Sequence, residues 1–443
     1  MGDLKSLFRG IAVVIDDEVK VENSEIDQLA KQIEDDNCHV IRIPQLPTDA
    51  QLDTLTEAAF FILDWNLHNV QAAAALVGNF PLVRTPQLLI KQHIEDNLDF
   101  LKKIRDRRFA PVFIFTNEYP ETVKQALSDA GLFSDSPRDH IFVLGKAAVL
   151  TDGVFKILTE WIKSHPSAYV LKRWEEAYAN TRNSFFVDFY SLSHLWPVVL
   201  WKTYSLDHVS EAAELTSMIA RNIISRLAPV PFDPNIVVAA DHVDAVAGEI
   251  TQEEICKVLE GERFVRHNRL QAEVSVGDVF KDKGRYFVNV RPECDCVARD
   301  GQSINEVEMY LIRGDKVADH NFHKTFNTDL GNFNDRETSG TIFAMYEGVT
   351  VCFQFKELQI VEWGNWKNKR IGRLIPPYST KLQQRFGAFI QRIGLARIPA
   401  QAVPHKTDTA AEHHDSVQHG TQSNYSEFTA MDHFKAFLSK LIF

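Results

Sequence analysis

The stretch FFILDWN, residues 60–66, places four apolar side chains directly before an aspartate. A short, continuous apolar run is typical of a strand buried on both faces of a parallel sheet. The stretch IAVVIDDE, residues 11–18, repeats the pattern with two aspartates after the run. Further β-like runs lie at 39–43, 112–115 and 141–144, and segments with helical spacing separate all five. This alternation predicts an α/β domain with a doubly wound, five-stranded parallel sheet.

Polar side chains stand at the carboxyl ends of four of these expected strands. They are Asp16 and Asp17, Asp64, Thr116 and Lys146. In a doubly wound sheet such ends converge on one crevice, where three carboxylates repel each other and require a cation. Oxygen ligands select a hard ion such as Mg²⁺. We therefore expect Asp64 to attack a phosphorus in line, while Thr116, Lys146 and the metal take up the charge of the transferred oxygens.

This set of residues resembles the receiver domains of the response-regulator family, over residues 8–165. The matching segments are VVIDDE for the acidic pair, FILDWN for the acceptor, FIFTNE for the hydroxyl and VLGK for the lysine. The resemblance implies a flavodoxin-like fold. It also implies a phosphate donor, which is a histidine kinase or a histidine phosphotransfer protein.

The same resemblance assigns roles to individual residues. Asp17 would bind the metal directly and Asp16 partly through water, and Asp64 and the backbone carbonyl of Asn66 would complete the metal site. The side chains of Asn66 and Glu118 would flank the path of the hydrolytic water and so set the lifetime of the phosphoryl group. We expect a labile phosphoryl group, because both side chains can hydrogen-bond a water and neither is bulky enough to block it.

Three departures from the family pattern stand out. Asp64 and Thr116 are 52 residues apart, longer than is usual in the family, and the excess falls at 68–93. Ala147 follows the lysine where the family usually has a cis-proline, and Val143 stands where it often has a switching aromatic residue. These departures leave the expected chemistry intact and concern the usual readout of phosphorylation.

The rest of the chain divides by composition into four segments. Residues 166–230 carry no strand pattern and predict a helical connector, whose aromatic stripe indicates core packing or a homodimer contact. Short β-like runs between Gly- and Asp-rich turns predict an α+β domain over 231–402. The polar segment 403–425 is typical of disorder, and 426–443 predicts a terminal amphipathic helix that docks on its own domain or on a partner.

Cys294 and Cys296, with His320 and His323, supply donors of the kind that bind Zn²⁺. Their spacing does not match a standard zinc finger, and short strands often carry a buried cysteine. We therefore expect core residues and no stoichiometric zinc.

The segment 361–397 is rich in basic residues and carries Trp363 and Trp366. It indicates a site for nucleic acid, a site for an acidic partner, or a solvated basic helix face, and the last is the commonest of the three. The eight cations are Lys367, Lys369, Arg370, Arg373, Lys381, Arg385, Arg392 and Arg397.

The overall composition sets limits on function. A chain of 443 residues forms two or three domains, and its net charge of −12 disfavours nonspecific binding of nucleic acid by the chain as a whole. Five scattered cysteines indicate a reducing compartment. No stretch has the roughly eighteen apolar residues that a membrane span needs, and the first residues lack the apolar core of a signal peptide. We expect a cytoplasmic protein without a membrane anchor.

Three functions are compatible with these features. The first is a signalling or phosphate-buffering protein of a two-component phosphorelay that acts on an effector protein; in outline the chain resembles receiver proteins of prokaryotic phage-defence loci, which implies an antiviral role. The second is a DNA-binding response regulator that uses 361–397. The third is an effector enzyme with its site around Cys294 and His320. We favour the first, with no enzymatic activity beyond self-phosphorylation and autodephosphorylation, because no recognition helix or nuclease-like constellation is evident.

Overall fold

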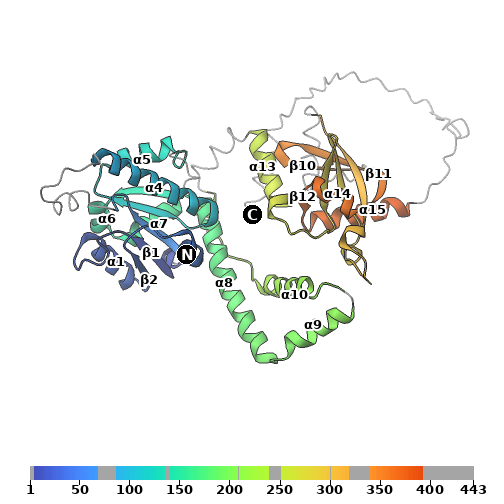
Figure 1. Cartoon of the computed structure of the whole chain (residues 1–443), viewed down its shortest axis with the longest axis horizontal. Helices are drawn as coiled ribbons and strands as arrows, with labels where there is room; N and C mark the ends of the chain where they lie inside the picture. Colours follow the sequence, from blue (N-terminus) through green and yellow to red (C-terminus); the bar gives the residue numbers. More distant parts are fainter. Residues whose placement is uncertain are drawn as a thin grey trace, which may run out of the picture. The chain divides into compact units, whose positions relative to one another are not determined.

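A computed structural model describes residues 4–67, 86–134, 140–207, 209–238, 251–299, 301–318, 340–344 and 346–392 (Figure 1). Several predictions from the sequence fall outside these residues. They concern most of the 68–93 insertion, His320 and His323, Arg397, and the segments 403–425 and 426–443. None of the helices that the structure describes combines the length and the apolar character needed to cross a bilayer.

The N-terminal domain is a five-stranded sheet in the order β2-β1-β3-β4-β5, with parallel neighbours throughout. Helices connect the strands, so the expected parallel α/β architecture is confirmed, and the strand order fits a flavodoxin-like fold. The elements are η1 (Leu4–Phe8), β1 (Ile11–Ile15), α1 (Glu25–Asp35), β2 (His39–Ile43), α2 (Asp49–Thr54), β3 (Ala58–Asp64), α4 (Pro86–Arg107), β4 (Val112–Thr116), α5 (Pro120–Asp129), β5 (Ile141–Gly145), α6 (Lys146–Asp152) and α7 (Val154–Lys163).

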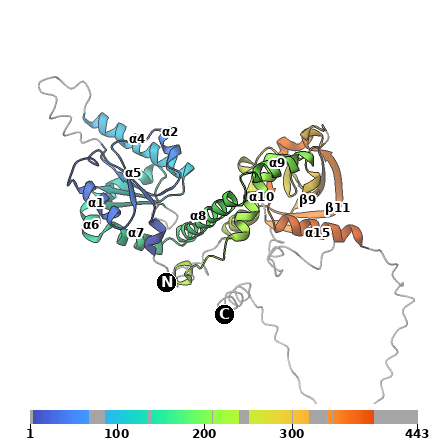
Figure 2. The same ribbon diagram turned by 90° about the horizontal axis from the view of Figure 1, so that it is seen from below.

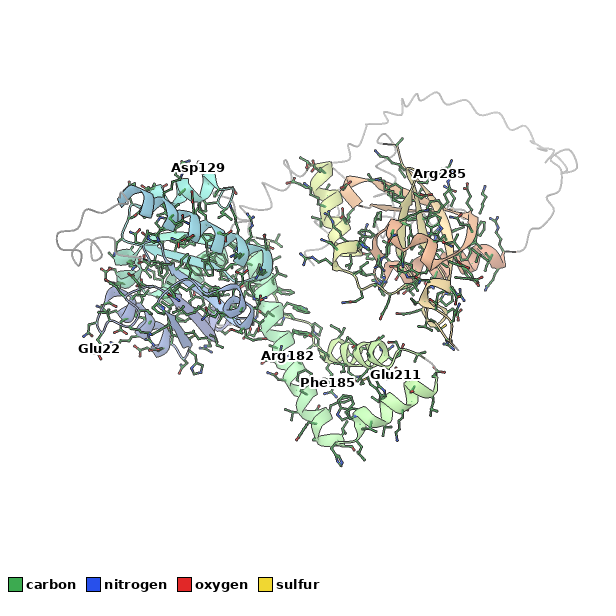
Figure 3. All side chains as sticks on the ribbon, in the orientation of Figure 1. Glu22, Asp129, Arg182, Phe185, Glu211 and Arg285 are labelled. Carbon is green, nitrogen blue, oxygen red and sulfur yellow. The ribbon has the colours of Figure 1, made fainter. Side chains whose placement is uncertain are left out.

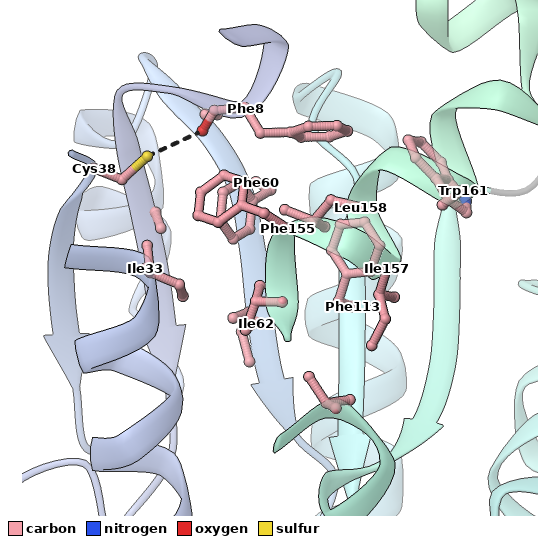
Figure 4. Close-up of a cluster of buried hydrophobic side chains, with 14 of the residues drawn as sticks. Phe8, Ile33, Cys38, Phe60, Ile62, Phe113, Phe155, Ile157, Leu158 and Trp161 are labelled. Atoms are coloured by element: carbon pink, nitrogen blue, oxygen red, sulfur yellow. Dashed lines mark hydrogen bonds between the residues drawn. The ribbon is translucent and has the colours of Figure 1, made fainter. Parts of the chain in front are cut away.

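The sheet is buried on both faces, which explains the continuous apolar runs of its strands. On one face α1, α6, α7 and η1 pack against alternate strand residues, including Phe60, Ile62 and Phe113 (Figure 4). Phe60 makes edge-to-face contacts with Phe8 and Phe113, with ring centroids 6.1 Å apart in each pair. On the other face α2, α4 and α5 cover the intervening residues, such as Phe61. Strands fixed on both faces hold their carboxyl ends in a defined place.

The connector is helical, as expected from the sequence. It comprises α8 (Pro166–Leu192), α9 (Trp196–Leu206) and α10 (Glu211–Arg226). The short α11 (Pro234–Val237), which lies in the segment expected to begin the α+β domain, packs in the core of the α/β domain instead. The first turn of α8 belongs to the N-terminal core through Tyr169, whose hydroxyl accepts a 2.8 Å hydrogen bond from the backbone N–H of Asp233. The start of the connector is therefore anchored on the α/β domain.

The C-terminal domain contains a seven-stranded antiparallel sheet in the order β10-β11-β9-β8-β7-β12-β6, so the α+β prediction holds. One face packs against α15 (Figure 2). Leu382 of this helix is buried beside the strands. The other face packs against α14 through Trp363. The elements are α13 (Gln252–Arg263), β6 (Phe264–Arg266), η2 (His267–Arg269), β7 (Asp278–Asp282), β8 (Arg285–Asn289), η3 (Glu293–Asp295), η4 (Ile304–Glu306), β9 (Glu308–Lys316), β10 (Gly340–Ala344), η6 (Tyr346–Gly348), β11 (Thr350–Glu362), α14 (Trp363–Trp366), η7 (Lys367–Lys369), β12 (Arg370–Leu374) and α15 (Tyr378–Gln391).

The expectation of a solvated basic helix at 361–397 is wrong for part of the segment. The described residues form the end of β11, two short helical turns, β12 and α15. On β12, Arg373 Nε lies 2.7 Å and Arg370 Nη1 lies 3.5 Å from the carboxylate of Asp278, which is fully buried. Both cations neutralise a buried carboxylate, and Arg370, whose side chain is 1% exposed, is out of reach of an external polyanion.

Candidate functional site

The strand registers set the carboxyl ends of the parallel sheet level with one another. They pair Ile15 with Leu63, Asp64 with Phe115 and Thr116 with Gly145. The residues that follow Ile15 and Gly145 are Asp16 and Lys146, so the predicted side chains meet at one edge. The prediction that these strand ends converge is therefore matched by the geometry.

Three carboxylates gather at this edge. One oxygen from each of Asp16, Asp17 and Asp64 lies within 4.8 Å of the others. Asp16 is fully buried and Asp64 is 6% exposed, whereas Asp17 is half-buried. An all-oxygen donor set that carries three negative charges is chemically suited to a hard divalent cation.

Lys146 bridges two of the carboxylates. Its Nζ lies 2.8 Å from Asp16 Oδ2 and 3.2 Å from Asp64 Oδ2. The lysine itself is buried, and it is the first residue of α6, so the end of β5 delivers it directly into the pocket. The one positive charge of Lys146 does not balance the two carboxylates that it bridges, which is a further reason why the pocket suits a cation.

The pocket alters the pKa values of its groups. Burial raises the pKa of Asp64 to about 6; the nearby Asp16 carboxylate adds to the rise, while the Lys146 ammonium and the backbone N–H of Asn66 oppose it. Burial acts to lower the pKa of Lys146, but the carboxylates of Asp64 and Asp16 outweigh burial and raise it. Lys146 is therefore a permanent cation near neutral pH, and Asp64 is ionised above about pH 6.

Tight turns fix the other polar groups. Asp16 Oδ1 accepts a 2.8 Å hydrogen bond from the backbone N–H of Glu18, and Thr116 Oγ1 accepts a 3.0 Å bond from the backbone N–H of Glu118. Thr116 is 1% exposed, and a hydroxyl that accepts in this way can still donate its own hydrogen. The side chains of Asn66 and Glu118 are exposed, and their role beside the path of an incoming water stays a prediction.

Asn97 on α4 is a residue of this site that sequence reasoning missed. It is 2% exposed, and its side-chain amide donates a 2.7 Å hydrogen bond to the backbone carbonyl of Trp65. Trp65 follows Asp64 and precedes Asn66, whose carbonyl is a predicted metal ligand. The sequence does contain an indication that Asn97 is buried. It lies three residues after Ile94 and four before Leu101, on the apolar face of its helix. A polar amide in that position must satisfy its hydrogen bonds inside the protein.

The two clustered cysteines of the C-terminal domain do not point to a formed metal site. Cys294 is exposed and Cys296 is buried. The Cys296 sulfur accepts a 3.5 Å hydrogen bond from the amide of Asn289, and burial raises its pKa to about 11. Zinc binds the thiolate, so this environment opposes binding. Because both histidines lie outside the described residues, the expectation of no stoichiometric zinc stays a prediction.

Comparison with known proteins adds no family to these observations. No protein-family model matches the chain, and no curated protein matches it. The function has to be argued from the chemistry of the pocket.

Proposed function

We propose that the N-terminal domain is a receiver that takes a phosphoryl group onto Asp64 in a Mg²⁺-dependent reaction, with a histidine kinase or a histidine phosphotransfer protein as the donor. The observation that supports this most directly is the buried contact of Lys146 with both Asp16 and Asp64, at the carboxyl edge of a parallel sheet. A nucleophile, an acidic metal site and a fixed cation are the components that acyl-phosphate formation requires.

In the proposed reaction an ionised oxygen of Asp64 attacks the phosphorus of a phosphohistidine. The new P–O bond forms as the P–N bond breaks, and the imidazole nitrogen leaves with the electron pair and takes up a proton. Lys146 and the Thr116 hydroxyl stabilise the negative charge on the phosphoryl oxygens. Asp16, Asp17, Asp64 and the carbonyl of Asn66 would hold the Mg²⁺, which when bound supplies further charge neutralisation.

The output of the proposed receiver runs through a regulated partner, or the domain serves as a phosphate sink. Two features of the C-terminal half make the DNA-binding alternative less attractive. Arg370 and Arg373 are committed to Asp278, and Lys369 lies 3.3 Å from Asp282. The cations that suggested a nucleic-acid surface are thus partly engaged within the domain itself.

Labelling with a small phosphodonor such as acetyl phosphate tests the proposal. We expect the wild-type chain to incorporate phosphate with Mg²⁺ and not with excess chelator, and Asp64→Asn to incorporate none. Asp129→Asn is the matched control, because Asp129 is an exposed aspartate of the same domain. Lys146→Ala should label about a hundredfold more slowly, since it removes a fixed charge from the site of transfer. If Asp64→Asn labels as well as Asp129→Asn, the acceptor is misassigned.

A further inference from the structure

The connector helix α9 is apolar on all sides. It reads WPVVLWKTYSL and carries a single charge, Lys202. None of its residues is buried. A helix without a polar face is normally found inside a protein, where neighbours cover it on every side.

Apolar side chains are also exposed on the two helices that flank α9. Figure 3 marks these two helices by the buried Phe185 on α8 and by Glu211 at the start of α10. We define the connector face by six large apolar residues of α8, α9 and α10 whose exposed fractions lie between 58% and 87%. They are Val187, Tyr190, Leu192, Val199, Leu206 and Ile224.

The connector buries too little of itself to account for its own stability. Over 166–207 and 209–226, the buried side chains are Tyr169, Lys172, Phe185 and Ile223. Tyr169 belongs to the core of the α/β domain. Around Phe185, the Arg226 guanidinium lies 5.3 Å from the ring centroid and pairs with Asp188 at 2.5 Å. Helices of this length depend on burying an apolar face, so a further surface must cover the connector.

The charge of the connector indicates what that surface is. Residues 166–226 contain six basic and six acidic residues, whereas the whole chain has a net charge of −12. The net charge of the whole chain opposes the close approach of two copies, whereas this segment adds no net charge to a contact between them. An interfacial membrane helix would need a polar face rich in Lys and Arg, and α9 has one lysine and no such face.

The connector face is also large enough for a stable dimer contact. A standard stable interface buries about 800 Å² on each partner, and six side chains of this size and exposure offer an area of that order. Aromatic and large aliphatic side chains supply most of the energy of such contacts.

We propose that the connector face is the contact through which two copies of this chain associate. The proposal does not rest on the phosphorylation of Asp64. The connector face of one copy contacts the connector face of a second copy. We therefore expect the full-length chain to be a dimer whose affinity depends on α9.

Sedimentation velocity of the full-length chain, measured over a wide range of concentrations, tests this. We expect a dimer that dissociates on dilution, and Val199→Glu or Leu206→Glu should weaken it roughly tenfold or more, because a charge would be buried at the contact. Val258→Glu on α13 is the matched control, since Val258 is 70% exposed but lies outside the connector face. Circular dichroism checks that each variant is folded.

Hydrogen exchange of α9 supplies a second measurement. In a dimer, its amides are protected at high concentration and lose protection on dilution. A monomer whose α9 is protected at every concentration would show that the chain covers the helix itself, and would overturn the proposal. A monomer that binds phosphatidylcholine or phosphatidylserine vesicles through α9 would overturn it in favour of a lipid surface. Equal masses of wild type and Val199→Glu at all concentrations would also overturn it.

Discussion

The side-chain amide of Asn97 holds the backbone carbonyl of Trp65 at 2.7 Å, with both residues buried. This hydrogen bond connects α4 to the loop that runs from Asp64 to Leu67. Because the next residue, Asn66, donates its backbone N–H to Asp64 and is expected to offer its carbonyl to the metal, Asn97 is a positioning residue for the pocket.

We predict that Asn97→Leu weakens Mg²⁺ binding several-fold and lowers the free energy of unfolding by about 1–3 kcal/mol, because it leaves the Trp65 carbonyl buried without its donor. Tryptophan fluorescence during a Mg²⁺ titration measures the affinity, and Trp65→Phe identifies the contribution of the tryptophan beside the site. Gln92→Leu, an exposed change on the same helix, is the control. Identical titrations for the two leucine variants would show that Asn97 does not hold the loop, while a conservative Asn97→Gln change should restore part of the affinity.

The raised pKa of Asp64 predicts a pH-dependent cost to the metal-free fold. The pKa moves from 3.8 to about 6, so the native state favours the protonated acid. Protonation of Asp64 therefore stabilises the folded state. This stabilisation is complete below about pH 4 and is lost as the pH rises through about 6. Without Mg²⁺, Asp64→Asn should therefore be more stable than wild type by about 1–3 kcal/mol near pH 8, and the difference should vanish in acid.

Thermal unfolding at several pH values, with and without Mg²⁺, measures this difference. Mg²⁺ should stabilise the wild type more than Asp64→Asn, because the variant has lost a ligand and a negative charge. Asp129→Asn should follow the wild type throughout. A variant that is less stable than wild type at every pH would show that the ionised Asp64 is well accommodated by the pocket.

The exposure of Asn66 and Glu118 predicts a short-lived phosphoryl group. Water must approach the phosphorus opposite the Asp64 oxygen, and both side chains can hydrogen-bond it without blocking the path. Replacing either by methionine should lengthen the lifetime several-fold by excluding water. Decay of the label after removal of the donor measures it, with the exposed Glu121→Met as control. A lifetime of many hours that neither change alters would mean that another part of the chain controls access.

Because Asp278 is buried, we expect its replacement to cause a large, local loss of stability in the C-terminal domain. Asp278→Ala would leave Arg370, whose side chain is 1% exposed, without its partner carboxylate, and breaking such a pair costs about 3–5 kcal/mol. Asp282→Ala on the same strand removes a partly exposed pair with Lys369 and should cost at most about 1 kcal/mol. Hydrogen exchange of β7 and β12 under mild denaturant distinguishes the two. Equal losses of stability in the two variants would show that the pairs of Arg370 and Arg373 with Asp278 contribute no more than a surface ion pair.

Sequence reasoning located the pocket because each of its residues ends an apolar run, and the geometry of parallel strands places such ends together. Asn97 was missed because its partner is a backbone carbonyl 32 residues away, and a hydrogen bond of this kind leaves no spacing pattern. The basic segment was misread for a related reason. Counting charges showed that Arg370 and Arg373 are cationic, but only the pairing of β12 with β7 reveals that a buried aspartate faces them.

The contact between Asp16 and Lys146 also bears on how the pocket comes into existence. The two residues are 130 positions apart, so nearly the whole α/β domain must be synthesised before Lys146 can reach its partner. Contacts of such long sequence separation form late and slowly, because the chain between them has to be ordered first. During synthesis two aspartates already follow the first strand, yet Lys146, which pairs with Asp16, comes only after the last strand. The nascent chain therefore lacks the complete set of pocket residues until β5 has joined the sheet. In the proposed receiver, phosphate incorporation at Asp64 would thus report the finished domain rather than any earlier folding intermediate.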